Sequence, residues 1–201
     1  MTSVTIIGAG NMGGAIAGIA AAGGNPVQVL TRTGTAIEGA TAGKVGDPIS
    51  GEIVILALPY PAVSEVLGAY EGQLDGLVLV DLTNPLDFST FDALVVPDGS
   101  SAAAEIATQV PGARVLKAFN TNFAATLAAK SVAGIPTAVL IAGDDTDAKS
   151  ALAGVIETGG LKAVDAGSLK RAHELEALGF LQLTLAAANK TAWTSGFALA
   201  D

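Results

Sequence analysis

Three glycines near the start of the chain have the spacing of a phosphate-binding loop. Gly8, Gly10 and Gly13 form the pattern G-x-G-x-x-G, directly after the apolar run VTII and before an alanine-rich stretch. In such a loop the first glycine permits a tight turn, the second lets the backbone approach a pyrophosphate, and the third allows close helix–strand packing. The following helix would offer free N–H groups and a partial positive charge to the phosphates. We therefore expect a dinucleotide-binding loop; an ordinary turn in a glycine-rich protein is the alternative.

The residues between these glycines would also face the cofactor. Asn11 and Met12 occupy the first positions of the expected helix, so their side chains would lie over the pyrophosphate. We assign cofactor contacts to the whole loop, which comprises Gly8, Ala9, Gly10, Asn11, Met12 and Gly13.

The end of the second apolar run indicates which dinucleotide is bound. Enzymes that use NAD usually carry Asp or Glu here, which bonds the ribose 2′-hydroxyl. This chain has Thr31, Arg32 and Thr33 instead, and no carboxylate lies between Gly13 and Glu38. Arginine can stack on adenine and pair with a 2′-phosphate, and threonine hydroxyls can donate to its oxygens. The sequence therefore predicts NADP(H), with a solvated loop arginine as the alternative.

Three later stretches, ALPY, TNPL and KAFNT, follow apolar runs and could hold the reactive end of the dinucleotide. In an open α/β sheet, ligands bind beyond the carboxyl ends of the strands. We expect Leu58 and Pro59 to wall the nicotinamide or its ribose. We expect Asn84, Asn120 and Thr121 to bond its carboxamide, its ribose or the hydride acceptor, although Asn-Pro is also a common turn.

Few residues could serve as an acid or base. A reductase of carbonyls or alcohols needs a group that transfers a proton. His173 is the single histidine. It either contacts the site or lies at the surface, where it could cap a helix. Lys117 follows an apolar strand and is either buried and paired or extended to solvent. We find no Ser-Tyr-x-x-x-Lys set, nucleophile or metal-ligand cluster, and assign no catalytic and no metal-binding residue.

That lack of acid–base groups favours one kind of chemistry. Hydride exchange between a nicotinamide and a flavin-like ring needs chiefly proximity and orientation of the two reacting carbons. A chain with an NADP-binding half and an apolar second half of small residues suits this reaction.

The charge and composition of the chain restrict the classes of molecule that it can bind. The chain has 201 residues and a formal net charge of −9, so it is repelled by nucleic acid and by anionic membranes. It has no cysteine, which excludes disulfides and thiolate sites. No apolar run reaches the roughly 18–20 residues of a membrane span, and the N-terminus has no basic segment typical of a signal peptide. We expect a cytoplasmic protein with small-molecule partners and no nucleic-acid or membrane partner.

Apolar runs and helix-compatible segments alternate along the chain. The expected strands are 4–7, 27–30, 53–58, 77–81, 114–119, 137–142 and 162–165. The expected helices are 11–22, 62–70, 102–110, 147–158 and about 169–192. The segment 34–51 is rich in glycine and threonine and would hold at most a short, weak helix.

This alternation predicts an α/β fold, a Rossmann-type doubly wound parallel sheet with a small C-terminal α/β extension. We expect one domain over residues 1–201, in which 1–125 form the NADP-binding core and 126–201 close the substrate cleft.

The motifs in order resemble the F420-dependent NADP oxidoreductases, and the same motifs relate the chain to the oxidoreductase domain of the STEAP metalloreductases. The resemblance covers almost the whole length. It is carried by GAGNMG, LTRT, ALPYPAV, LTNPL, VLKAFNT, IAGDD, VDAGSLKRAHELEAL and LQLTLA.

The resemblance implies hydride transfer between the nicotinamide C4 of NADP(H) and the deazaflavin C5 of coenzyme F420. It also implies a homodimer. By position, the nicotinamide side would be formed by Leu58, Pro59 and Tyr60, and the hydride cleft by Asn84, Ala118 and Asn120. Trp193 and Phe197, near the C-terminus, would either line this cleft or pack in a dimer interface.

Other functions share parts of this pattern. An NADPH-dependent flavin or metal-chelate reductase would use the same cleft, and a non-catalytic NADPH-binding module would need no acid or base. A β-hydroxyacid or imine reductase shares the N-terminal motifs. It normally carries a long helical C-terminal domain, for which we see no room in this sequence.

Overall fold

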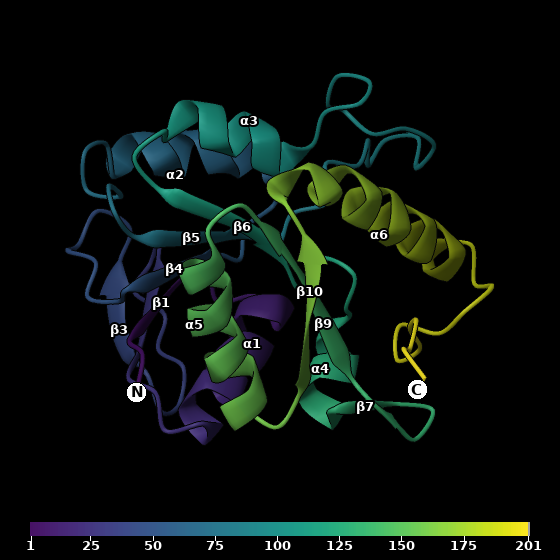
Figure 1. Cartoon of the computed structure of the whole chain (residues 1–201), viewed down its shortest axis with the longest axis horizontal. Coiled ribbons are helices and arrows are strands. Elements are labelled where there is room, and N and C mark those ends of the chain that lie inside the picture. Colours follow the sequence, from purple (N-terminus) through teal and green to yellow (C-terminus); the bar gives the residue numbers. More distant parts are fainter. Residues whose placement is uncertain (201) are drawn as a thin grey trace.

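A computed structural model describes residues 1–200, which form an eight-stranded sheet with helices on both faces (Figure 1). The strand order is β10-β9-β6-β5-β4-β1-β2-β3. The strands of this sheet are β1 (Val4–Ile7), β2 (Val27–Thr31), β3 (Thr41–Lys44), β4 (Ile53–Leu56), β5 (Val78–Asp81), β6 (Arg114–Ala118), β9 (Ala138–Gly143) and β10 (Lys162–Gly167). The expected Rossmann-type α/β fold is confirmed.

The helices divide between the two faces of the sheet. They are α1 (Asn11–Ala22), α2 (Val63–Ala69), α3 (Ala102–Gln109), α4 (Ala124–Ala129), α5 (Thr146–Thr158) and α6 (Ala172–Ala187), with short 3₁₀ turns η1 (Tyr60–Ala62) and η2 (Leu169–Arg171). Helix α1 packs with α4 and α5 on one face, and α2 packs with α3 on the other (Figure 1). Every residue of β1, β4 and β5 is buried, as expected for strands covered on both faces.

The sheet is not wholly parallel, and this corrects the sequence prediction. Strands β1 to β6 of the sheet pair in parallel, as do β9 and β10, but β9 runs antiparallel to β6. The chain reverses between them through α4 and a small hairpin of β7 (Ser131–Val132) and β8 (Ile135–Pro136). A hairpin-like return permits antiparallel pairing, whereas a parallel pair requires a longer crossover.

The largest differences from the predicted elements are at three places, apart from shifts of one or two residues elsewhere. The strand expected over 53–58 ends at Leu56, so the following residues leave the sheet before Pro59. The Gly/Thr-rich segment 34–51 contains the edge strand β3 rather than a weak helix; its pairing with β2 overrides its poor apolar pattern. The last long helix begins as the turn η2 and ends at Ala187, not near 192.

Candidate functional site

The glycine-rich loop joins β1 to α1. At two of its positions, Gly8 and Gly13, the local geometry permits only glycine. Gly8 has φ = +116°, a conformation that favours glycine, and a Cβ there would collide with the carbonyl oxygen of Ala57. A Cβ on Gly13 would collide with the carbonyl oxygen of Gly8. These contacts place the start of α1 tightly against the ends of β1 and β4.

Gly10 has no such structural reason to be glycine. Its φ is −71°, which any residue adopts, and a Cβ built there would meet no heavy atom within 4 Å. Gly10 is exposed at the N-terminus of α1, where no side chain caps the helix. The open space and the uncapped N–H groups fit a pyrophosphate that approaches the backbone closely.

The end of β2 presents the residues predicted to select NADP(H). Thr31 is nearly buried, and its Oγ1 accepts a hydrogen bond from the N–H of Thr35 at 2.7 Å, which fixes the turn. The hydroxyls of Thr33 and Thr35 lie 2.8 Å apart. Arg32 is exposed and, within residues 1–200, forms no ion pair. Its guanidinium is thus free to pair with an anion at this edge of the sheet.

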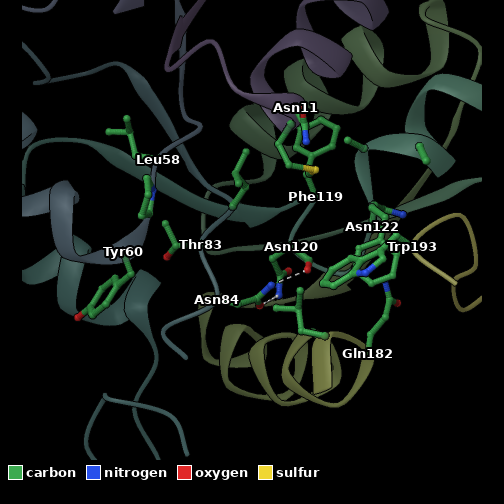
Figure 2. Close-up of a pocket in the computed structure, with 18 of the residues that line it drawn as sticks. Asn11, Leu58, Tyr60, Thr83, Asn84, Phe119, Asn120, Asn122, Gln182 and Trp193 are labelled. Carbon is green, nitrogen blue, oxygen red and sulfur yellow. Dashed lines mark hydrogen bonds between the residues drawn. The ribbon is translucent and has the colours of Figure 1, made fainter. Parts of the chain in front are cut away.

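A cavity of about 420 Å³ lies farther along the same edge, beyond the ends of β4, β5 and β6 and against α6 (Figure 2). Several predicted residues line it together: Asn11, Met12, Leu58, Pro59, Tyr60, Asn84 and Asn120. Ala118 does not; its side chain is buried within the core. Thr121, a further expected polar contact, is buried and does not line the cavity either.

The sequence did not indicate every residue of this cavity wall, and for Trp193 it left two positions open. Its further lining residues include Thr83, Phe119, Asn122, Phe123, Gly179, Gln182 and Trp193. Phe119 and Asn122 stand in or beside the quoted motif, so their position after a strand could have indicated them. Gln182 lies in an apolar helix that gave no such indication. Trp193, for which a cleft or an interface position was open, lines the cavity and packs on Phe123 with ring centroids 5.1 Å apart.

Two asparagines join the strand ends to α6. Asn84 Nδ2 donates to the carbonyl of Asn120 at 2.9 Å, and Asn120 Nδ2 donates to Asn84 Oδ1 at 2.9 Å (Figure 2). Asn120 Nδ2 also donates to the carbonyl of Leu175, on α6, at 2.8 Å. A Cβ on Gly179 would collide with Asn84 Oδ1, so this glycine allows α6 to lie against the pair.

Lys117 is buried and paired, one of the two roles left open for it. Its Nζ lies 2.7 Å from both Asp81 Oδ2 and Glu176 Oε1, and all three side chains are almost inaccessible to solvent. Glu176 also accepts from the N–H of Ala102, at the start of α3. Burial raises the pKa of Glu176, and the Lys117 ammonium opposes that shift. This network ties α6 and α3 to β5 and β6 and so fixes the roof of the cavity.

Tyr60 is the one titratable side chain among the described residues of the cavity wall. Its pKa is raised above 10.0, first by burial and then by the negative charge of Glu105, so it stays protonated at neutral pH. His173 lies outside the cavity, exposed, with Nδ1 3.0 Å from the carbonyl oxygen of Ser100. The cavity therefore offers amides, apolar surface and aromatic rings but no charged acid or base.

Within residues 1–200 there is neither a metal-binding cluster nor a membrane-spanning helix. Among residues 1–200, no group of three or more His, Asp or Glu side chains is arranged to hold a metal ion. No helix in that range has the length and apolar character needed to span a bilayer.

Comparison with known proteins gives consistent matches. The family model described as "NADP oxidoreductase coenzyme F420-dependent" matches residues 3–85. An F420-dependent NADP reductase of Methanothermobacter marburgensis is 30% identical over 172 residues, which cover 82% of this chain and 75% of that protein. Metalloreductase STEAP3 of Rattus norvegicus is 31% identical over 132 residues, or 66% of this chain and 26% of that longer protein.

A solved structure from Arthrobacter sp. FB24, described as a candidate F420-dependent NADP reductase, has the same fold. It aligns over 100% of both chains with a TM-score of 0.87 and 26% sequence identity.

Proposed function

Because the chain belongs to the family of F420-dependent NADP reductases, we propose that it transfers a hydride between NADP(H) and coenzyme F420. The observation that carries the proposal is the cavity wall, where none of the lining residues within 1–200 is a charged acid or base. A hydride passes directly from the C4 of NADPH to the C5 of the deazaflavin, with the accompanying proton taken from water. Such a reaction requires the protein to hold two rings in contact rather than to donate a proton.

The dinucleotide site follows the carboxyl edge from β2 to β4. The backbone of residues 8–13 binds the pyrophosphate, and Arg32, with Thr31 and Thr33, binds the 2′-phosphate. Leu58, Pro59 and Tyr60 would then flank the nicotinamide. The free guanidinium, the uncapped helix N-terminus and the open space at Gly10 support this assignment.

The acceptor ring would occupy the aromatic side of the cavity. Phe119, Phe123 and Trp193 offer flat apolar surfaces there, and the Asn84–Asn120 pair offers polar contacts at its centre. Phe119 has φ = +64°, a left-handed conformation that is strained for a bulky residue and is often found at ligand sites. These walls would orient the ring and exclude water. In this proposal the segment 126–201, of which the structure describes 126–200, closes the cleft over the core formed by residues 1–125.

We also propose that the protein is a homodimer of the cytoplasm. Large apolar side chains are exposed on α6, the loop after β5 and the C-terminal segment: Phe88, Phe91, Val95, Leu181, Trp193, Phe197 and Leu199. Exposed apolar side chains of this size support contact with a second copy.

The test is a spectrophotometric assay of the purified protein with NADPH and oxidised F420, with FMN and FAD in parallel. The proposal predicts NADPH-dependent loss of the F420 absorbance. Reduction of a flavin but not of F420 would indicate a flavin reductase. Tight NADPH binding without turnover of any of these acceptors would indicate a binding module.

A further inference from the structure

The cavity wall contains four buried oxygens that accept or donate no hydrogen bond with any group of residues 1–200. Within residues 1–200, the buried side-chain polar atoms without a hydrogen-bond partner are Thr83 Oγ1, Asn120 Oδ1, Asn122 Oδ1 and Gln182 Oε1. All four side chains line the cavity. A buried polar group without a partner destabilises the fold, so native proteins rarely keep one without a reason such as a ligand. Four of them in one cavity indicate a site that accepts hydrogen bonds.

Gln182 is the one amide of this group whose side chain makes no hydrogen bond within residues 1–200; the Thr83 hydroxyl also has no partner in that range. Asn120 donates through Nδ2 to two partners, and Asn122 Nδ2 donates to the carbonyl of Ala138 at 3.0 Å. The Gln182 side chain makes no hydrogen bond with any residue in the range 1–200, although the residue is only 5% exposed. No hydrogen bond within residues 1–200 therefore accounts for the placement of its amide in the cavity.

The surroundings of Gln182 define the shape of its ligand. Figure 2 shows its amide directed from α6 toward Trp193 and Asn122. The Trp193 ring packs on Phe123, so the amide lies beside an aromatic wall. Leu58 and Tyr60, on the expected nicotinamide side, are drawn across the cavity from this cluster (Figure 2). A ligand here would be a flat ring with hydrogen-bond donors on its edge.

We propose that Gln182 binds the imide edge of the pyrimidinedione ring of F420, an inference that rests on the proposed function. An imide edge presents an N–H between two carbonyl groups. The carboxamide of glutamine presents one acceptor and two donors. Gln182 Oε1 accepts from the ring N3–H, and Nε2 donates to an adjacent ring carbonyl. Asn122 Oδ1, in the same wall, is a further acceptor for donors on this ring.

This pairing determines which end of the ring faces α6. The nicotinamide carboxamide also presents a carbonyl beside an N–H donor and can pair with glutamine at two points. The N3-methyl probe and the NADPH titration therefore distinguish the imide edge from the nicotinamide. Flavins share the imide edge with F420, so the contact orients either ring and does not by itself separate them. Comparison of FMN with F420 therefore shows which ring the protein accepts. Comparison of a deazaflavin with its N3-methyl derivative shows whether Gln182 bonds the imide edge.

The experiment compares wild-type protein with Gln182→Met, which keeps the side-chain length and removes both polar groups. Gln73→Met, at an exposed turn, is the matched control. The probes are F420, a 5-deazaflavin methylated at N3, its unmethylated parent, and FMN. Trp193, the single tryptophan, lines the cavity and reports binding by its fluorescence.

We expect wild-type protein to bind the N3-methyl probe about tenfold more weakly than its parent, the scale of one or two hydrogen bonds. In Gln182→Met, F420 should bind about tenfold more weakly than in wild type, and the two deazaflavins should bind equally. The dissociation constant of NADPH should be unchanged, and Gln73→Met should match wild type throughout.

Three results would overturn the proposal. Unchanged F420 affinity in Gln182→Met would refute the contact and leave the proposed function standing. Equal weakening of F420 and NADPH would show a general structural role for Gln182. Binding of FMN but not of F420 by the wild-type protein would overturn both this contact and the proposed function.

Discussion

Replacement of Gly10 by alanine separates a ligand-binding role of the glycine loop from a structural one. A Cβ at this position meets no protein atom within 4 Å, and the backbone conformation is ordinary. Glycine-to-alanine changes at such positions stabilise by about 0.4–1 kcal/mol through the unfolded chain. Alanine is a poorer helix N-cap than glycine, which offsets part of this gain. We expect the free energy of unfolding to change by less than about 1 kcal/mol.

The expected effect on NADPH is much larger. The added methyl group would occupy the space through which the pyrophosphate approaches the start of α1. Loss of two backbone N–H bonds to charged oxygens, each contributing about 1.5–3 kcal/mol, removes at least about 3 kcal/mol of binding free energy. The dissociation constant of NADPH should therefore rise by about 100-fold or more.

The assay pairs urea denaturation with NADPH titration, and two variants in α1 provide controls. Gly18→Ala, at an exposed helical position with open space around it, should gain about 0.5–1 kcal/mol of stability and keep its NADPH affinity. Gly13→Ala should be clearly destabilised, because its Cβ would collide with a backbone carbonyl. A Gly10→Ala protein that binds NADPH like wild type would refute the assignment of the pyrophosphate to this loop.

Four further changes test other parts of the site. Arg32→Ala should raise the KM for NADPH by about 10- to 100-fold and alter that for NADH little; equal effects on both would exclude the 2′-phosphate contact. Lys117→Met should lower the free energy of unfolding by about 3–5 kcal/mol in urea, because it leaves buried carboxylates unpaired; a loss below about 1 kcal/mol would contradict the burial argument. His173→Ala should keep kcat, whereas a loss of about 100-fold or more would reveal a missed proton donor. Hydrogen bonds from Lys149 chiefly lower the pKa of Asp165, so this stabilisation is present above about pH 4 and is lost as pH falls through the lowered pKa; Asp165→Asn should slightly lower the Tm at pH 7 but not at pH 2.

The sequence predicted the features that depend on local pattern. Buried strands such as Ile53–Leu56 are continuous apolar runs, and the loop with Gly8 and Gly13 has steric requirements that only glycine meets. The residues that follow such strands, including Leu58 and Asn120, therefore lie where the fold places strand ends, at the wall of the cavity.

Features that depend on distant contacts were not predictable in the same way. Strand β3 is polar and exists because β2 offers it a pairing edge. The antiparallel direction of β9 depends on the path of the chain through α4. Gln182 lies in a helix that is apolar around most of its surface, so periodicity could not show that its amide faces the cavity. The predicted division at residue 125 and the assigned cofactor contacts remain predictions.

The most direct test of the account is the fate of the transferred hydrogen. The enzyme would be incubated in ordinary water with F420 and NADPH that carries deuterium at both C4 positions, and the reduced F420 analysed by mass spectrometry. Direct transfer predicts that each reduced F420 molecule carries deuterium at C5. Reduced F420 without deuterium would show that the hydrogen passes through an exchangeable group, and would contradict transfer between two rings held in one cavity.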